Sequence, residues 1–193
     1  MRSGPGSYIT RSKVIDIALP HINGRKLVLQ AGGHLGVWPK KLAEHFERVL
    51  TVEPEPRNVE CLRANTEGLA VEIFVGVLGS NSGIAKVNNR ETSTGSHHIA
   101  TRMDVPWIEV PMFTIDQLCE GRKVDAIFLD VEGYELNALR GATRILADRP
   151  TMVIEQNACA KKFDGADGLA EKFLYGLGYR RVATFDEDVI LVC

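Results

Sequence analysis

The chain has 193 residues, of which 45% are hydrophobic and 25% charged, and this composition is that of an ordinary globular protein. The formal net charge is −2, so the sequence lacks the basic surface with which proteins bind nucleic acid or anionic membranes. No apolar run is long enough to span a bilayer. We therefore expect neither a nucleic-acid partner nor a membrane partner.

The length is sufficient for one domain with a sizeable core, and no linker or internal repeat divides the sequence. We expect a single domain over residues 1–193, with an N-terminal extension over 1–26 and a loop or hairpin excursion over 77–113. The first residues lack the apolar core of a signal peptide, which favours a cytoplasmic location. The sequence specifies no oligomeric state.

The cysteines lie far apart and form no C-x-x-C pair, so the sequence indicates neither a zinc clip nor a redox pair. They are Cys61, Cys119, Cys159 and Cys193. Free thiols in a reducing compartment are the expected state.

Strands and helices alternate at short spacing in the first part of the chain. Strands are predicted at 26–31, at 49–52 with Glu53 at the end, and at 71–75. Helices are predicted through Lys40 to Phe46, with Pro39 in the first turn, and over about 57–65. This alternation predicts right-handed crossovers and a parallel sheet.

The middle of the chain, over 76–104, is rich in Gly, Ser, Asn and Thr and predicts a long loop or β-hairpin over the sheet edge. Extended stretches are expected near 84–87 and over 107–113. His97 and His98 in this excursion are either solvated or contact an acceptor.

Two aromatic residues, Trp107 and Phe113, either pack the excursion onto the domain or form a wall against a sugar ring.

Regular alternation resumes after Phe113. The predicted elements are a short helix at 114–118 capped by Thr114, a strand at 124–130, a helix at 135–146, a strand at 151–155, a helix at 168–175, and a hairpin of 179–184 with 189–193. A parallel α/β sheet that ends in an antiparallel hairpin is less common among nucleotide-binding folds.

An apolar strand ends in carboxylates at Asp130, Glu132 and Glu135, with Gly133 among them. Acids at the carboxyl end of a buried strand lie at the rim of an open α/β sheet, where such folds bind ligands. A helix start explains Glu135, since acids there complement the helix dipole. It does not explain Asp130, because an unpartnered charge at the end of an apolar strand is costly.

A glycine-rich loop follows the first strand, with glycines at 32, 33 and 36. The spacing G-G-x-x-G differs from the G-x-G-x-x-G of dinucleotide-binding folds. It suits S-adenosylmethionine better, because that ligand has no pyrophosphate; structural glycines in a tight turn are the alternative. Glu53, about 20 residues after the first glycine, is placed to accept the hydroxyls of an adenosine ribose.

These segments together resemble the FkbM-type family of S-adenosylmethionine-dependent methyltransferases, over about 27–155. The motifs are Ala-Gly-Gly-His-Leu-Gly at 31–36, Val-Glu-Pro-Glu-Pro at 52–56, Phe-Thr-Ile-Asp-Gln-Leu at 113–118, and Leu-Asp-Val-Glu-Gly-Tyr-Glu-Leu-Asn-Ala-Leu-Arg-Gly-Ala at 129–142. The resemblance implies an α/β, Rossmann-like class I methyltransferase fold, with a mostly parallel sheet, helices on both faces and a C-terminal antiparallel hairpin. It also implies O-methylation of a hydroxyl of a sugar, glycan or small molecule.

The resemblance assigns S-adenosylmethionine a set of binding residues. They are Gln30, Ala31, Gly32, Gly33, His34, Leu35 and Gly36 around the methionine part, Glu53 and Pro54 at the ribose, Gly76 and Val77 at the adenine, and Asp130 near the sulfonium and the acceptor. The family carries an acid where this chain has Gln30, and that acid helps to hold the ammonium group of the cofactor. Gln loses the charge assistance of such a contact.

Transfer to a hydroxyl needs a base or a metal. We expect Asp130 to act as the base or to orient the acceptor, with Glu132 in support. A divalent cation is a second possibility, since Asp130, Glu155 and Asn157 would form an oxygen-rich site for Mg²⁺. Other functions open to this sequence are a non-catalytic binding domain, which Gln30 suggests, and a nicotinamide-dependent oxidoreductase, which the glycine spacing and the hairpin disfavour.

Overall fold

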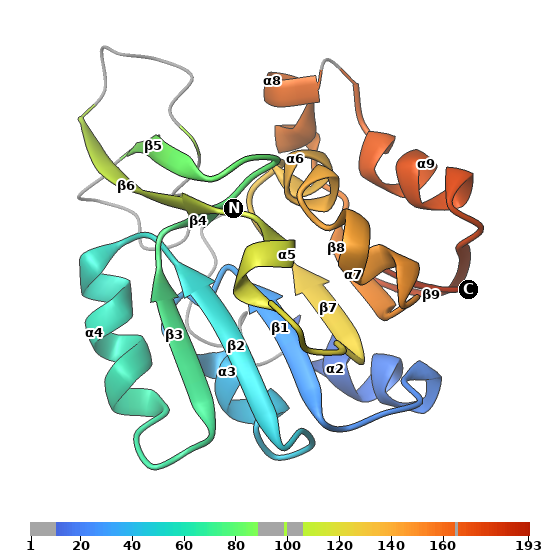
Figure 1. Ribbon diagram of the computed structural model, residues 1–193, viewed down its shortest axis with the longest axis horizontal. Coiled ribbons are helices and arrows are strands. Elements are labelled where there is room, and N and C mark those ends of the chain that lie inside the picture. The colour runs from blue at the N-terminus through green and yellow to red at the C-terminus, as the bar shows by residue number, and fades with distance from the viewer. Residues whose placement is uncertain (1–10, 89–98, 100–105, 165) are drawn as a thin grey trace.

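The computed structural model describes residues 11–88, 99, 106–164 and 166–193, and its centre is a seven-stranded sheet (Figure 1). The strands are β1 Leu27–Ala31, β2 Arg48–Glu53, β3 Val71–Val75, β4 Val77–Leu78, β5 Gly83–Asn88, β6 Trp107–Phe113, β7 Ala126–Leu129, β8 Thr151–Glu155, β9 Arg180–Phe185 and β10 Asp188–Val192. The helices are α2 Lys13–Ala18, η1 Leu19–His21, α3 Val37–Leu42, α4 Pro56–Asn65, α5 Ile115–Leu118, α6 Glu135–Arg140, α7 Thr143–Ala147, η2 Ala158–Ala160, α8 Lys161–Asp164 and α9 Leu169–Gly176, of which η1 and η2 are 3₁₀ turns.

The order of the large sheet is β3-β2-β1-β7-β8-β10-β9. The first five of these strands are parallel, and β10 runs antiparallel to both β8 and β9. The chain leaves β1 toward β2 and later returns to pair β7 on the other side of β1, so the strand order reverses at β1. Ligands of open α/β sheets bind outside the carboxyl ends of the strands at such a reversal.

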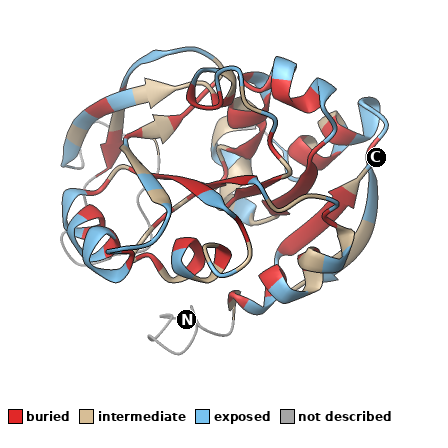
Figure 2. Ribbon diagram, turned by 60° about the horizontal axis from the view of Figure 1, so that its bottom comes forward, coloured by how far each residue is buried: buried red, intermediate tan, exposed pale blue. Residues whose placement is uncertain are grey.

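Each face of the sheet is buried under its own layer of helices (Figures 1 and 2). One core contains Leu29, Ile127 and Ile154 from the strands and continues into α5, α6, α7 and α9. The other contains Phe128 and Val153 and continues into α2 and α3. Side chains alternate between the faces along each strand, so the central strands β7 and β8 are buried along their whole length, as expected of a sheet covered on both sides.

The predicted mostly parallel sheet with a closing hairpin is confirmed, and the predicted strands lie within a residue or two of their expected positions. Thr114 caps α5 as predicted, because its hydroxyl accepts a hydrogen bond from the backbone N–H of Gln117 at 3.1 Å. All four cysteines are free, also as predicted.

The prediction of one helix over 135–146 is wrong, because the segment forms α6 and α7 with a break at Gly141. A Cβ on Gly141 would lie 2.2 Å from the carbonyl oxygen of Gly79, so glycine permits a close approach of two backbones. Asp116 then caps the second helix, because its carboxylate accepts the N–H groups of Arg144 and Ile145. The helix therefore loses one hydrogen-bonded turn at the break, and backbone groups there form hydrogen bonds to neighbouring segments instead.

The excursion contains a separate three-stranded sheet in the order β4-β6-β5, with β5 and β6 antiparallel. Phe113 packs edge-on against Phe74 with ring centroids 6.1 Å apart, so it joins the excursion to β3 as one of the two interpretations predicted. Trp107 is 37% exposed, and the Lys86 ammonium lies 4.0 Å from its ring centroid. His97 and His98 lie outside the described residues.

The N-terminal extension adds a helix that sequence reasoning did not predict. Val14, Ile15 and Ala18 of α2 are fully buried in the core beneath β7, β8 and β10. The chain therefore reaches the carboxyl edge of the sheet at Arg11, immediately before this helix. In the described part of the chain, no helix combines the length and apolarity that crossing a membrane requires.

Candidate active site at the carboxyl edge of the sheet

The glycine loop joins the ends of three strands. The N–H groups of Gly32 and Gly33 both donate to the carbonyl of Val52 in β2, at 3.1 and 3.0 Å. Gly32 has φ +87°, and a Cβ there would lie 2.0 Å from the carbonyl oxygen of Asp130. Asp130 in turn donates its N–H to Ala31 at 3.1 Å. Only glycine fits at Gly32, since the backbone is left-handed and the next loop leaves no space.

The side chain of Gln30 is fully buried and supports this loop from within the sheet. Its amide nitrogen donates to the carbonyl oxygens of Ala31 and Gly32, at 3.1 and 2.9 Å. Its amide oxygen accepts from the Thr51 hydroxyl at 2.6 Å. A carboxylate could not make the first two bonds, because it has no hydrogen to donate. Gln30 is therefore matched to the loop that it supports.

Glu53 ties the loop to the start of α4. Its carboxylate accepts from the N–H of His34 at 2.8 Å, from the N–H of Glu55 at 3.1 Å and from the Asn58 amide at 3.0 Å. Burial raises its pKa, and these three donors lower it. A carboxylate has about four lone-pair positions, so this group keeps acceptor capacity for a ligand hydroxyl.

The other residues assigned to the adenosine lie beside Glu53. Pro54 directly follows it, and the N–H of Gly76 donates to the carbonyl of Glu53 at 3.2 Å. A Cβ on Gly76 would lie 2.3 Å from the carbonyl oxygen of Pro111, so this glycine is required by the approach of β6. Val77 begins β4 and packs in the core of the small sheet.

The other half of the edge carries a row of three acids. Asp130 follows β7, Glu155 ends β8, and Asp188 begins β10, where it is the cross-strand partner of Glu155. Glu155 and Asp188 are buried, and the side chain of Asp130 is 23% exposed. The acids on β7 and β8 are among the predicted site residues, whereas Asp188 is not.

Arg11 is the cation of this row. Its guanidinium donates to Glu155 in a close ion pair, and it lies 3.9 Å from a carboxylate oxygen of Asp130 and 3.9 Å from one of Glu187. Asp130 and Glu155 also share a hydrogen bond that lowers the pKa of Asp130 and raises that of Glu155.

Burial raises the pKa of every acid in the row, to about 7 for Asp130, about 8 for Glu155 and about 7 for Asp188. The charge of Arg11 opposes this rise for all three acids. The acids of the row consequently hold their protons to higher pH than exposed acids do, and Asp130 changes its charge in the range where a general base is effective.

Glu132 and Glu135 have different roles in the loop after β7. Glu132 has φ +56° and points its carboxylate toward Cys159, and burial raises its pKa to about 7. Glu135 is buried and accepts the N–H groups of Val131 and Gly133, at 3.0 and 3.2 Å. Glu135 is thus a structural acid of the helix start, in line with its sequence context.

The oxygen-rich metal site predicted from Asp130, Glu155 and Asn157 is not formed. The amide nitrogen of Asn157 donates to Glu155, its oxygen accepts from the N–H of Cys159 at 2.9 Å, and Arg11 pairs with both acids. Across the ranges that the structure describes, no group of three or more His, Cys, Asp or Glu residues is arranged to hold a metal ion.

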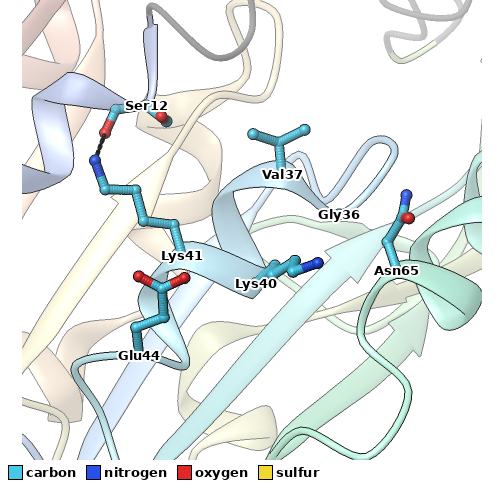
Figure 3. Close-up of a pocket in the computed structure, with 7 residues that line it drawn as sticks. All are labelled: Ser12, Gly36, Val37, Lys40, Lys41, Glu44 and Asn65. Carbon is cyan, nitrogen blue, oxygen red and sulfur yellow. Dashed lines mark hydrogen bonds between the residues drawn. The ribbon is translucent and has the colours of Figure 1, made fainter.

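A pocket of about 360 Å³ lies outside the glycine loop, between Ser12 and Asn65 (Figure 3). It is lined by Ser12, Gly36, Val37, Lys40, Lys41, Glu44 and Asn65. The Lys41 ammonium donates a hydrogen bond to the carbonyl of Ser12 at 3.1 Å, and the Asn65 amide donates one to the carbonyl of Leu35 at 2.7 Å. Asn65 thus connects α4 to the glycine loop at Leu35.

Comparison with known proteins decides the family. A family model described as the methyltransferase FkbM domain matches residues 31–181, which is well over half of the chain. The chain belongs to the FkbM methyltransferase family. The protein is accordingly an S-adenosylmethionine-dependent methyltransferase, as the motifs predicted. A search of curated proteins gave no match.

Solved structures share the fold at low sequence identity. The N-methyltransferase NodS from Bradyrhizobium japonicum is 13% identical with a TM-score of 0.56, and the match covers 100% of this chain and 97% of that one. NodS in complex with S-adenosyl-L-homocysteine gives 15% identity, a TM-score of 0.53 and coverages of 98% and 87%. A putative O-methyltransferase from Klebsiella pneumoniae gives 12%, 0.54, 99% and 80%. The predicted class I methyltransferase fold is confirmed.

At β1 and β2 the edge carries a glycine loop that tolerates no Cβ at Gly32 and a buried acid, Glu53, at the end of β2. Arg11 and Asp188 lie outside the matched residues 31–181, and sequence reasoning assigned neither to the site. The usable signal for Asp188 was an acid directly before the apolar run of Val189 to Val192.

Proposed function

We propose that this FkbM methyltransferase transfers a methyl group to a hydroxyl of a sugar, glycan or other small molecule, with Asp130 as the general base. The observation that carries the proposal is the carboxylate of Asp130, half-buried at the edge, beside the glycine loop and with a pKa of about 7. A hydroxyl acceptor needs such a base to remove its proton, whereas a neutral amine can attack with its free electron pair and needs no base for that step.

The residues of the loop support cofactor binding in this proposal. The loop Ala31 to Gly36 would hold the methionine part of S-adenosylmethionine, Glu53 its ribose, and Gly76 its adenine. When bound, the cofactor supplies an electrophilic methyl on a sulfonium, which leaves as a neutral thioether. Gln30 would act through the loop rather than on the ammonium group, because both ends of its amide are bonded within the fold.

Asp130 would accept the proton of the acceptor hydroxyl as the oxygen attacks the methyl carbon in line with the departing sulfur. One C–O bond forms and one C–S bond breaks, and the proton ends on the Asp130 carboxylate. Glu132 follows on the same loop and would orient the acceptor. Alignment by the two halves of the edge would supply most of the remaining rate enhancement.

The test is the rate of S-adenosylhomocysteine formation with a panel of glycans and small polyols, for wild type and Asp130→Asn. We expect turnover with at least one acceptor and a fall of about 10²–10⁴-fold in Asp130→Asn, which is the usual contribution of a general base. The control is Asp186→Asn, an exposed aspartate in the β9–β10 turn. A folded Asp130→Asn protein with the wild-type rate would refute the role of Asp130.

A further inference from the structure

The three acids at the edge occupy one layer of one face of the sheet. Phe128, Val153 and Ile190 lie in the core under α2, and they pair across β7, β8 and β10. Along a strand the second residue returns to the same face. Two residues from each of these apolar side chains, toward the edge, are Asp130, Glu155 and Asp188. The layer above the α2 core is therefore made of carboxyl groups on three neighbouring strands.

This layer has too little positive charge. Directly opposed like charges on neighbouring strands destabilise a sheet, and Glu155 and Asp188 are such a pair. Asp188 is fully buried, and within the described ranges neither of its carboxylate oxygens has a hydrogen-bond partner. Because an uncompensated buried charge is costly, Asp188 must retain a proton or be balanced by a nearby cation.

Arg11 is the only cation that the described residues bring into contact with the row. It stands one turn before Ile15, whose fully buried side chain fixes α2 beneath β7 and β8. The position of the guanidinium is therefore set by the packing of the helix. Arg11 lies before the first residue of the FkbM match, whereas Asp130 and Glu155, with which it pairs, lie inside the match.

We propose that Arg11 is a positioning residue of the acceptor site, whose charge favours the ionised form of Asp130. This rests on the proposed role of Asp130 as the base. The N-terminal extension is then part of the active site. Its contribution is electrostatic, because the guanidinium lies 3.9 Å from Asp130 and makes its hydrogen bond to Glu155.

All charged groups around Asp130 enter this balance. Arg11 and the hydrogen bond from Glu155 favour the ionised form, whereas burial, Glu132 and Asp188 oppose it. Glu187 adds a further negative charge beside Arg11, and Lys162 acts on the more distant Glu132. Loss of Arg11 leaves only acids against Asp130 at the row itself, so its proton should be held to higher pH.

The test is a carbon-13 NMR titration of the Asp130 carboxyl in protein labelled at aspartate, with Asp130→Asn used to assign the signal. In Arg11→Gln we expect the midpoint to rise by about one pH unit or more. Arg11→Lys should restore most of the wild-type midpoint. Lys13→Gln is the matched control, since it removes an exposed positive charge two residues away and should leave the midpoint unchanged.

A second variant keeps the test independent of folding in Arg11→Gln. Asp188→Asn keeps the size of the side chain and removes one opposing charge, so the midpoint of Asp130 should fall. An unchanged midpoint in both Arg11→Gln and Asp188→Asn, or an equal rise in Lys13→Gln, would overturn the proposal. If Arg11→Gln does not fold, an unchanged midpoint in both Arg11→Lys and Asp188→Asn would overturn it.

The titration needs neither acceptor nor cofactor, so its outcome is separate from that of the proposed function. If Asp130→Asn retains full turnover while Arg11→Gln shifts the midpoint, the base assignment fails and the electrostatic role of Arg11 stands. Where turnover is measurable, the acidic limb of its pH profile should shift to higher pH in Arg11→Gln by as many pH units as the midpoint does. In Arg11→Lys the limb should lie near its wild-type pH.

Discussion

The two halves of the carboxyl edge differ in how their buried polar groups are paired. At β1 and β2, the side chains of Gln30 and Glu53 are bonded to backbone groups and amides of the neighbouring loop. At β7, β8 and β10, three acids face one arginine, and the carboxylate of Asp188 has no hydrogen-bond partner among the described residues. In the first half, hydrogen bonds fix the glycine loop together with Gln30 and Glu53, and we call this group the cradle. In the second half, the charge of the three acids changes with pH.

The proposed binding and chemistry thus fall on different halves of the edge. A network of hydrogen bonds gives the rigid geometry that suits the proposed cofactor loop. Acids with raised pKa values suit the proposed general base. The halves meet where β1 pairs with β7, and there Gly32 packs on the backbone of Asp130.

The largest effect is expected where the halves touch. In Gly32→Ala the Cβ would lie 2.0 Å from the Asp130 carbonyl oxygen at a left-handed φ of +87°. We expect a loss of about 3 kcal/mol or more in the free energy of unfolding, measured by urea denaturation. The control is Gly68→Ala, at φ +75° with no atom within 4 Å, which should cost about 1 kcal/mol. Equal losses in the two variants would show that the contact is not tight.

The next effect concerns the cradle. Gln30→Glu restores the acid that the family normally carries, yet its carboxylate would face the carbonyl oxygens of Ala31 and Gly32. We expect a loss of about 2 kcal/mol in unfolding free energy at pH 7 and weaker binding of S-adenosylmethionine. Thr51→Val removes one hydrogen bond to Gln30 and should cost less. Tighter cofactor binding by Gln30→Glu would contradict this assignment.

The row of acids should make stability depend on pH. The folded-state pKa of Asp188 is raised to about 7 from an ordinary value of 3.8, and that of Glu155 to about 8 from 4.5. The folded protein therefore holds protons that the unfolded chain releases. The contribution of these two acids to the free energy of unfolding is fully present below about pH 4 and is lost as the pH rises toward 8.

Asp188→Asn should flatten this decline. We expect the wild type to lose on the order of 2 kcal/mol between pH 5 and pH 8, and the variant to lose clearly less. Urea denaturation at several pH values measures both, with Asp148→Asn, an exposed aspartate at the end of α7, as the control. A wild-type stability that rises over this interval would show that the row is ionised and compensated at neutral pH.

Sequence patterns predicted the cradle better than the row. The glycine spacing and the family motifs lie within 31–142, and they located the loop, Glu53 and Asp130. The row depends on Arg11 and Asp188, which come from the two ends of the chain and meet through the packing of α2 and the antiparallel pairing of β10. No local pattern encodes such a meeting.

Two further differences have local causes. A single helix was predicted over 135–146 because its apolar periodicity continues, but Gly141 and the cap from Asp116 break it. The glycine itself was the available signal. The metal interpretation of Asp130, Glu155 and Asn157 placed the oxygens correctly at one edge, but it did not include the guanidinium that pairs with both acids.

In our proposal the carboxyl edge is divided into a cofactor half at β1 and β2 and an acceptor half at β7, β8 and β10. Calorimetric titration of S-adenosylhomocysteine into Glu53→Gln and Asp130→Asn tests this division directly and requires no acceptor. We predict a loss of affinity of about tenfold or more in Glu53→Gln, which corresponds to about 1.4 kcal/mol, and an affinity within about twofold of wild type in Asp130→Asn. The opposite order of effects would contradict the account.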